Sequence, residues 1–203
     1  MSKLFESTRR WKDPHFLEGV LPILEAAFDR KELLSGADLK GASIGTGVNF
    51  PPTLLYANLF NARLEDSDFS EAKISTNFVS AQLARINFDR TAFDTCNFAR
   101  SSLRQCTFRE CNIDSPDLDD AKIIQCSFDR AVISSRRLHE YGGRRVLFDE
   151  CDFQNTAFKR LQFRACTFRN CNFEGARFKW CHLVAIKFEG KSPDPIAFEN
   201  CTS

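Results

Sequence analysis

A period of five residues constrains this chain more than any other feature. From Phe78 to Phe188, every fifth position is Leu, Ile or Phe at 22 of 23 places, and the exception is Gly143. A step of five advances a helix by about 140° and spreads the apolar residues around its axis, whereas an odd step reverses the faces of a strand. The chain must therefore turn within every five residues.

Each five-residue unit also has a small residue two positions before its large apolar centre. Cys96 precedes the centre Phe98 in this way, Asn97 between them points outward, and Ala99 and Arg100 form the corner. All nine cysteines occupy this small position. They are therefore predicted to be buried and reduced instead of forming disulfides or holding a metal.

With this unit the chain resembles the pentapeptide-repeat family, whose units read roughly Ala-Asp/Asn-Leu-x-x. Residues 57–61 and 96–100 match the unit, and the resemblance covers about residues 37–201. It implies an all-β fold, a right-handed four-sided parallel β-helix with one unit per side, about twenty residues per coil and coils ~4.8 Å apart. Every twentieth residue from position 88 to position 188 is a phenylalanine, and we expect these side chains to stack in one column: Phe88, Phe108, Phe128, Phe148, Phe168 and Phe188.

The chain is expected to form a single domain, with an N-terminal helical cap over residues 1–36 and the β-helix over residues 37–203. Asp13-Pro14, and Pro22 followed by a periodic apolar run to Gly36, predict a short pair of helices. Leu34 is expected on the apolar face of the second helix. The pair is interpreted as a plug over the open first coil, and the alternative is a surface for a partner or for dimerisation.

Two interruptions are expected within the β-helix, at residues 45–56 and 136–145. The first contains two glycines and two prolines and predicts a bulged corner or loop. Between them, the spacing from Ile74 to Phe78 is four instead of five, which predicts a tightened turn. A further break, KSPDP at residues 191–195, precedes the last unit.

The interruption at 136–145 spans ten residues, so the period continues in phase on both sides of it. Arg136 and Tyr141 occupy the small inward position there, and Gly143 a large centre. An unpaired charge inside the core is unfavourable, so the segment is predicted to bulge outward at least in part, with Leu138 still tucked in.

Composition gives little support for an enzyme, a membrane protein or a strongly charged binding protein. The net charge is +1 at pH 7, and no stretch approaches the ~20 apolar residues of a membrane span. His15, His139 and His182 lie in the cap, the interruption and a late repeat, so no two are expected to share a site. We therefore expect a cytoplasmic, non-enzymatic protein without a membrane segment, cofactor or metal.

Sorting the charges by side of a twenty-residue coil predicts one basic and one acidic side. The basic side has its centres at Leu64, Leu83, Leu103, Ile123 and Phe163, and the acidic side carries Asp94, Asp114, Asp152 and Glu174. The basic side and the interruption are interpreted as a partner-binding surface, and the alternative is ordinary solvated variation. The candidate partner-binding residues are Arg136, Arg137, His139, Tyr141, Arg144, Arg145, Arg85, Arg104, Lys122 and Arg164.

Three function hypotheses follow. The first is a protein-interaction scaffold with an unidentified protein partner. The second is implied by the resemblance, because several bacterial members mimic duplex DNA and protect or inhibit DNA gyrase, giving resistance to quinolones or peptide toxins; a type II topoisomerase would then be the partner. Those members are strongly acidic and dimerise through a C-terminal helix, whereas this chain has a net charge of +1 and ends in PIAFENCTS.

The third hypothesis, a nucleic-acid track along the basic side, is the least favoured because few aromatic residues point outward between the arginines. One assembly prediction accompanies all three. Residues 189–203 are expected either to form a short irregular cap or to leave the last coil open for an end-to-end homodimer.

Overall fold

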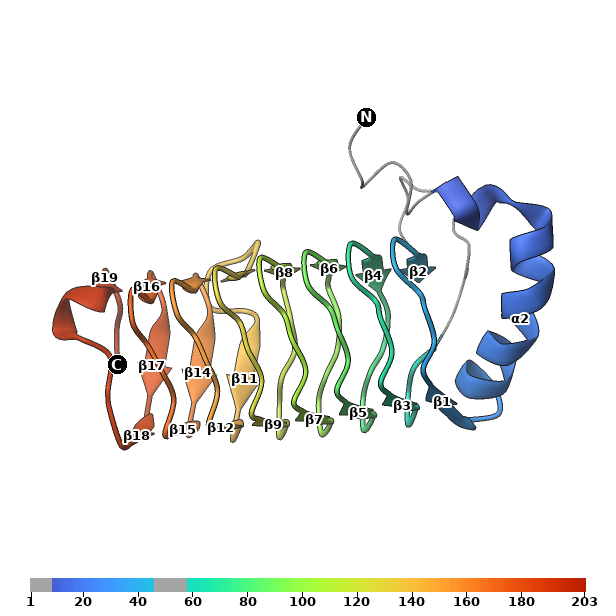
Figure 1. Cartoon of the computed structure of the whole chain (residues 1–203). Helices are drawn as coiled ribbons and strands as arrows, with labels where there is room; N and C mark the ends of the chain where they lie inside the picture. The colour runs from blue at the N-terminus through green and yellow to red at the C-terminus, as the bar shows by residue number, and fades with distance from the viewer. Residues whose placement is uncertain (1–8, 46–57) are drawn as a thin grey trace.

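The computed structural model describes residues 9–45 and 58–203, and it shows a solenoid of about seven turns preceded by one α-helix (Figure 1). The right-handed, four-sided parallel β-helix predicted from the repeats is confirmed. The predicted interruption at 45–56 falls almost entirely on residues 46–57, which lie outside the described residues.

Short parallel strands form three of the four sides, which we number in the order in which the chain meets them. The first side is an eight-stranded sheet. Its strands are β1 (Leu33–Ser35), β3 (Arg63–Glu65), β5 (Gln82–Ala84), β7 (Ser102–Arg104), β9 (Lys122–Ile124), β12 (Leu147–Asp149), β15 (Thr167–Arg169) and β18 (Lys187–Glu189). The second side has isolated parallel bridges in place of strands, such as Asn87 with Thr107.

The third side is also an eight-stranded sheet, and the fourth is a three-stranded one. The strands of the third side are β2 (Ser43–Gly45), β4 (Lys73–Ser75), β6 (Ala92–Asp94), β8 (Asn112–Asp114), β10 (Val132–Ser134), β13 (Ala157–Lys159), β16 (Arg177–Lys179) and β19 (Phe198–Glu199). Those of the fourth side are β11 (Gly142–Arg144), β14 (Gln162–Arg164) and β17 (His182–Val184).

The four sides together form the wall of the solenoid. The five-residue unit explains how this wall is built. The large centre and the small residue two positions before it are buried, as for Phe98 and Cys96, while the residues beside the centre face solvent or are half-buried. The residue two positions after the centre takes a left-handed conformation at nearly every corner, for example Arg100 with φ 57°. One unit therefore supplies one wall segment and one turn.

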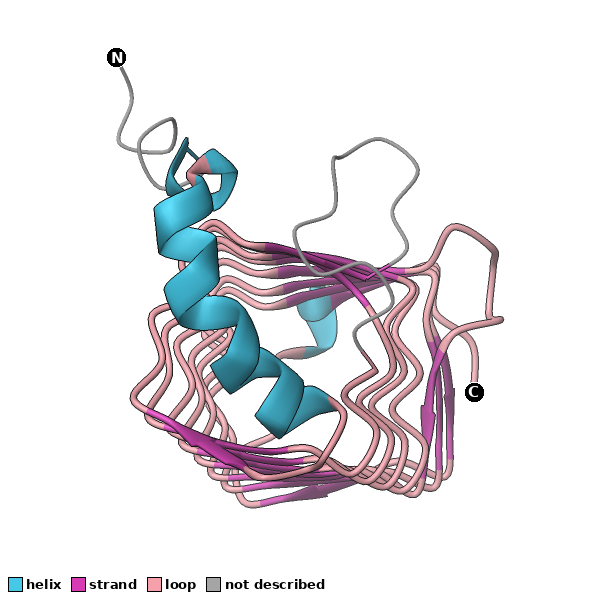
Figure 2. Cartoon of the chain, turned by 90° about the vertical axis from the view of Figure 1, so that its right-hand side faces the viewer, coloured by secondary structure: helices cyan, strands magenta, loops and turns pink. Residues whose placement is uncertain are grey.

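Within residues 9–36, the cap contains a single α-helix, α2 (Pro14–Phe28), preceded by a 3-10 turn, η1 (Arg10–Lys12), so the predicted pair of helices is wrong. Pro22 lies inside α2 instead of starting a second helix. Leu34, expected on that second helix, is a buried residue of β1 that pairs with Leu64, because the β-helix begins earlier than residue 37. Figure 2 shows α2 lying across the open end of the first coil.

Most coils have twenty residues, and three departures are visible in the strand register. Leu34 pairs with Leu64, so the first coil has 30 residues, and these include residues 46–57. Leu64 pairs with Leu83, so one coil has 19 residues, as the short spacing from Ile74 to Phe78 predicts. Phe148 pairs with Ile123, so a later coil has 25 residues. The interruption near residue 136 thus adds one complete unit to its coil.

This extra unit overturns the predicted column of six phenylalanines. Phe128 stacks on Phe153, with ring centroids 5.1 Å apart, and Phe148 continues the first side above Ile123. Phe148 itself stacks on Phe168 at 4.6 Å. The prediction failed because a unit that leaves the wall still occupies five residues. The period is therefore preserved, while every later unit lies one side earlier than a twenty-residue coil predicts.

The last coil is irregular. Residues after β18 bypass the second side and form the 3-10 turn η2 (Pro195–Ala197), where the Asp194 carboxylate accepts a hydrogen bond from the Ile196 amide. The chain then returns to the wall as β19, and Thr202 pairs with His182. Apolar residues near this end remain half-buried, among them Leu183, Ile186, Phe188 and Phe198.

Candidate functional site

The extra unit protrudes from the corner between the third and fourth sides (Figure 2). Residues 135–141 form this excursion, which we call the corner loop, and Gly142–Arg144 return to the wall as β11. The interruption in the wall is therefore narrower than the expected 136–145. Leu138 is not tucked in: its exposed fraction is 60%.

Two glycines allow the chain to return to the wall. Gly142 has φ 137°, and a Cβ atom there would lie 2.1 Å from the backbone oxygen of Gln162. A Cβ atom on Gly143 would lie 2.5 Å from Cγ2 of Val146. Gly143 therefore occupies the position of a large centre without a side chain because its neighbours already fill that space.

The corner loop brings two histidines together, contrary to the sequence prediction. The rings of His139 and His182 have centroids 5.3 Å apart. His139 Nε2 lies 3.0 Å from the Trp180 backbone oxygen, and His182 Nδ1 lies 2.8 Å from Thr202 Oγ1. The extra unit does not change the five-residue period, so it cannot be recognised from the spacing. It places His139 beside the coil that carries Trp180 and His182.

The other predicted basic residues do not form one side. Arg85, Arg104 and Lys122 lie on or beside the first side, whereas Arg144, Arg145 and Arg164 lie on or beside the fourth. The predicted acidic side is divided in the same way, because Asp94 and Asp114 belong to the third side but Asp152 pairs along the second. Both errors come from the unit that leaves the wall.

Many of these arginines are also neutralised by a carboxylate from the preceding coil. Arg85 pairs with Asp66 at 2.6 Å, Arg144 with Asp119 at 2.7 Å and Arg145 with Asp120 at 2.6 Å. Hydrogen bonds from the two partners Arg85 and Arg145 lower the pKa of Asp66 and of Asp120 respectively. These arginines stabilise neighbouring coils and are not free to attract an anionic ligand.

Arg136 of the corner loop has the same role on the third side. Its guanidinium reaches Asp94 at 2.6 Å and Asp114 at 2.5 Å. Arg137 pairs with Glu140 within the loop at 3.2 Å, and Tyr141 is half-buried where the loop ends. Leu138 and His139 are therefore the groups that the loop presents, and His139 lies beside His182 of β17.

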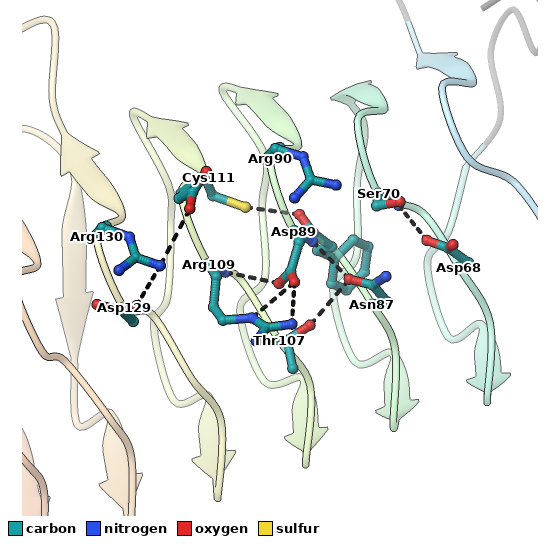
Figure 3. Close-up of polar contacts among 12 residues, drawn as sticks. Asp68, Ser70, Asn87, Asp89, Arg90, Thr107, Arg109, Cys111, Asp129 and Arg130 are labelled. Atoms are coloured by element: carbon teal, nitrogen blue, oxygen red, sulfur yellow. Dashed lines mark hydrogen bonds and ion pairs between the residues drawn. The ribbon is translucent and has the colours of Figure 1, made fainter. Parts of the chain in front are cut away.

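A polar network along the corner between the second and third sides was not predicted (Figure 3). Asp89, only 5% exposed, accepts hydrogen bonds from the Arg109 backbone N–H at 3.0 Å and from Arg109 Nε at 2.8 Å. Asn87 accepts from the Asp89 amide and from Thr107. The pairing of an acid with an arginine twenty residues later is the sequence signal for this network, which joins consecutive coils.

The cysteines are free, and eight of the nine are buried. Eight of the nine thiols lie against backbone oxygens of the preceding coil, as for Cys111 Sγ and Phe88 O at 2.9 Å, whereas Cys126 Sγ lies against Ile124 O. Burial raises the pKa of Cys96, Cys111 and Cys181 to about 12. Thiols of this kind are poor nucleophiles at neutral pH.

The described residues contain neither a metal-binding cluster nor a membrane-spanning helix. Within residues 9–45 and 58–203, no three metal-ligating side chains gather into a group that could hold an ion. In the same part of the chain, no helix is long and apolar enough to cross a membrane.

A four-sided parallel solenoid built from five-residue units defines a class of repeat protein. The family model "Pentapeptide repeat region" matches residues 144–202, and "Pentapeptide repeats (8 copies)" matches residues 76–114 and 93–130. The chain belongs to the pentapeptide-repeat family. No curated protein matches the sequence.

Solved structures with a similar fold include a trypsin-treated variant of QnrB1, a plasmid-mediated fluoroquinolone resistance protein, at 17% identity and TM-score 0.41, covering 83% of this chain and 87% of that one. HetL, involved in heterocyst differentiation regulation in Nostoc sp. strain PCC 7120, has 14% identity and TM-score 0.23, covering 78% and 85%. Rfr23 of Cyanothece 51142 has 14% identity and TM-score 0.24, covering 92% and 98%. These similarities concern the fold alone.

Proposed function

We propose that this protein is a non-catalytic scaffold that binds a protein partner through the corner loop. The observation that carries the proposal is Leu138, a large apolar side chain with an exposed fraction of 60% on a unit that has left the wall. Exposed apolar side chains on ordered protrusions are typical of the anchors that fill pockets in a partner. A unit that served the β-helix alone would place Leu138 inside.

The loop is held in one conformation by contacts with two coils. The His139 amide donates to the Arg160 backbone oxygen at 2.9 Å, and its ring contacts the Trp180 backbone oxygen. Arg136 fixes the start of the loop to Asp94 and Asp114. Because the loop is already ordered, binding through Leu138 would lose less conformational entropy than binding through a disordered segment.

A type II topoisomerase would be one such protein partner, and the capture experiment described below tests it together with any other protein partner. Mimicry of duplex DNA by a line of carboxylates has little support, because Asp66, Asp119 and Asp120 are paired with arginines. A phosphate track has little support for the converse reason: the predicted basic residues are divided between two sides.

Two variants test the loop. Deletion of residues 136–140 would restore a twenty-residue coil and leave Tyr141 at the small position, whereas Leu138→Asp keeps the loop and removes its apolar anchor. Ile23→Asp on α2 is the matched control, since Ile23 is 54% exposed and lies on the cap. It also tests the alternative that the cap is the partner-binding surface.

The measurement is capture of proteins from cytoplasmic extract, with DNA supercoiling by purified gyrase as a separate assay. We expect at least one protein that wild type and Ile23→Asp recover equally and both loop variants lose. Equal recovery of every protein by all four forms would contradict the proposal. A change in supercoiling that depends on Leu138 would identify the partner as gyrase.

End-to-end dimerisation through the last coil remains a separate proposal. The half-buried Leu183, Ile186 and Phe188 support it, because a second copy could cover them. Light scattering tests it directly: a dimer that Phe188→Glu converts to a monomer supports the proposal, and a wild-type monomer at all concentrations contradicts it.

A further inference from the structure

Four cations gather on two neighbouring coils at the C-terminal end of the third side. Lys159 of β13 lies directly beside Lys179 of β16, and Arg177 of β16 lies beside Ala157 of β13. Arg160 follows Lys159 at the corner. Like charges opposite each other on neighbouring strands destabilise a sheet, so this arrangement calls for a compensating anion.

The same side shows how the chain compensates for like charges elsewhere. Asp94 and Asp114 also lie directly opposite each other, and Arg136 bridges both of them. Among the described residues, Glu199 is the one counterion of these cations, and it pairs with Lys179 at 2.6 Å. Within the described part of the chain, Lys159, Arg160 and Arg177 form no ion pair.

Three of these cations line a shallow groove of about 500 Å³ over β13, β16 and β19: Lys159, Arg177 and Lys179. Glu199, the partner of Lys179, also lines it. The 3-10 turn η2 forms its edge and contributes Ile196, whose exposed fraction is 77%. The groove therefore combines an exposed apolar side chain, Ile196, with cations on two consecutive coils, which are ~4.8 Å apart. A ligand that matches both features carries carboxylates next to an apolar group.

We propose that this groove binds an acidic peptide segment of a protein partner, with its carboxylates on Lys159 and Arg177 and an apolar side chain on Ile196. The inference rests on the proposed function in that the ligand is a protein, but it uses a surface separate from Leu138. A nucleic acid fits less well, because single strands bind by stacking bases on aromatic rings. The nearest exposed ring, Trp180, already has Lys179 Nζ 4.5 Å and Arg160 Cζ 5.7 Å from its centroid.

Fluorescence anisotropy with a short labelled peptide of glutamates and two leucines tests the proposal. We expect wild type to bind the peptide saturably, with an affinity that falls as salt is added. The double variant Lys159→Glu/Arg177→Glu should lower this affinity by about tenfold or more. The matched control is Arg63→Glu/Arg104→Glu, which makes the same charge change on the first side. Ile196→Ser should weaken the leucine-containing peptide more than an all-glutamate peptide.

Several results would overturn the inference. They are the absence of saturable binding by wild type, equal weakening by the two double variants, and tighter binding of a single-stranded oligonucleotide than of the peptide. Circular dichroism on each variant would confirm that the β-helix is intact, and a variant that fails to fold would be replaced by Lys159→Gln/Arg177→Gln.

The two proposals fail separately. The peptide titration requires no partner, and the capture experiment with Leu138→Asp requires no peptide. If wild type binds no acidic peptide but captures a partner through Leu138, only the proposal that the groove binds a peptide is overturned. If wild type binds the peptide but no captured protein depends on the corner loop, only the proposal that the loop binds a partner is overturned.

Discussion

At the scale of single residues, the inward cysteines should be inert in the native protein. Eight thiols are buried, and burial raises the pKa of those at Cys96, Cys111 and Cys181 to about 12. Titration with a thiol-specific reagent at pH 8 should therefore detect about one fast thiol, the half-buried Cys201, and all nine after unfolding. Fast reaction of several thiols in the native state would contradict this packing.

The Asp89 carboxylate should contribute a pH-dependent part of the stability. Burial raises the pKa of Asp89, but hydrogen bonds from Arg109 and Thr107 outweigh this, so its pKa lies below the ordinary value of 3.8. The folded state then binds fewer protons than the unfolded state, and stability increases as the pH rises. The contribution should be complete above about pH 4 and should disappear as the pH falls through the lowered pKa.

Urea unfolding of Asp89→Asn checks this. We expect the variant to be less stable by about 1 to 2 kcal/mol at pH 7, because the charge-assisted hydrogen bonds from Arg109 are weakened. The difference should shrink toward zero below pH 3. Glu174→Gln, at an exposed position, is the control and should change little, and a difference for Asp89→Asn that does not depend on pH would contradict the ion-pair account.

At the scale of elements, β11 depends on the absence of a side chain at Gly143. In Gly143→Ala the new Cβ would lie 2.5 Å from Cγ2 of Val146 and 3.0 Å from Cβ of Leu118, so we expect destabilisation by about 1 to 3 kcal/mol. The additional change Val146→Ala should recover part of this loss. Thermal unfolding of the two single variants and the double variant measures the coupling.

The control for that substitution is Gly19→Ala in α2. Nothing lies within 4 Å of a Cβ atom there, so the same chemical change should leave the stability equal or slightly higher. Strictly additive effects of Gly143→Ala and Val146→Ala would show that the two side chains do not compete for the same space.

The wall could be predicted from sequence because each unit carries its own inward residues and its own corner. The coil length could not, because Leu138 has the position and character of an inward centre yet lies outside. The assignment of charges to sides and the separation of the histidines failed for this reason. The acid–arginine pairs contain the missing signal: Asp66 and Arg85 are 19 residues apart, Asp89 and Arg109 twenty, but Asp119 and Arg144 are 25 apart.

At the scale of the whole molecule, the stability of a solenoid is approximately the sum of terms within and between neighbouring coils. A unit that has left the wall adds little to those terms, so its removal should leave the remaining coils stacked as before. The ion pairs from Arg136 to Asp94 and Asp114 would be lost with it, and pairs on an exposed surface contribute roughly 0 to 1 kcal/mol each. The loop therefore has no evident role in the fold that would account for its presence.

The most direct test of this account is partner capture by the variant that lacks residues 136–140, compared with wild type at equal concentration and with both melting temperatures measured. We expect the two melting temperatures to agree within a few degrees and the captured partner to be lost. Undiminished capture by the shortened protein, or unfolding of its β-helix, would contradict the claim that the 25-residue coil carries an extruded unit for binding.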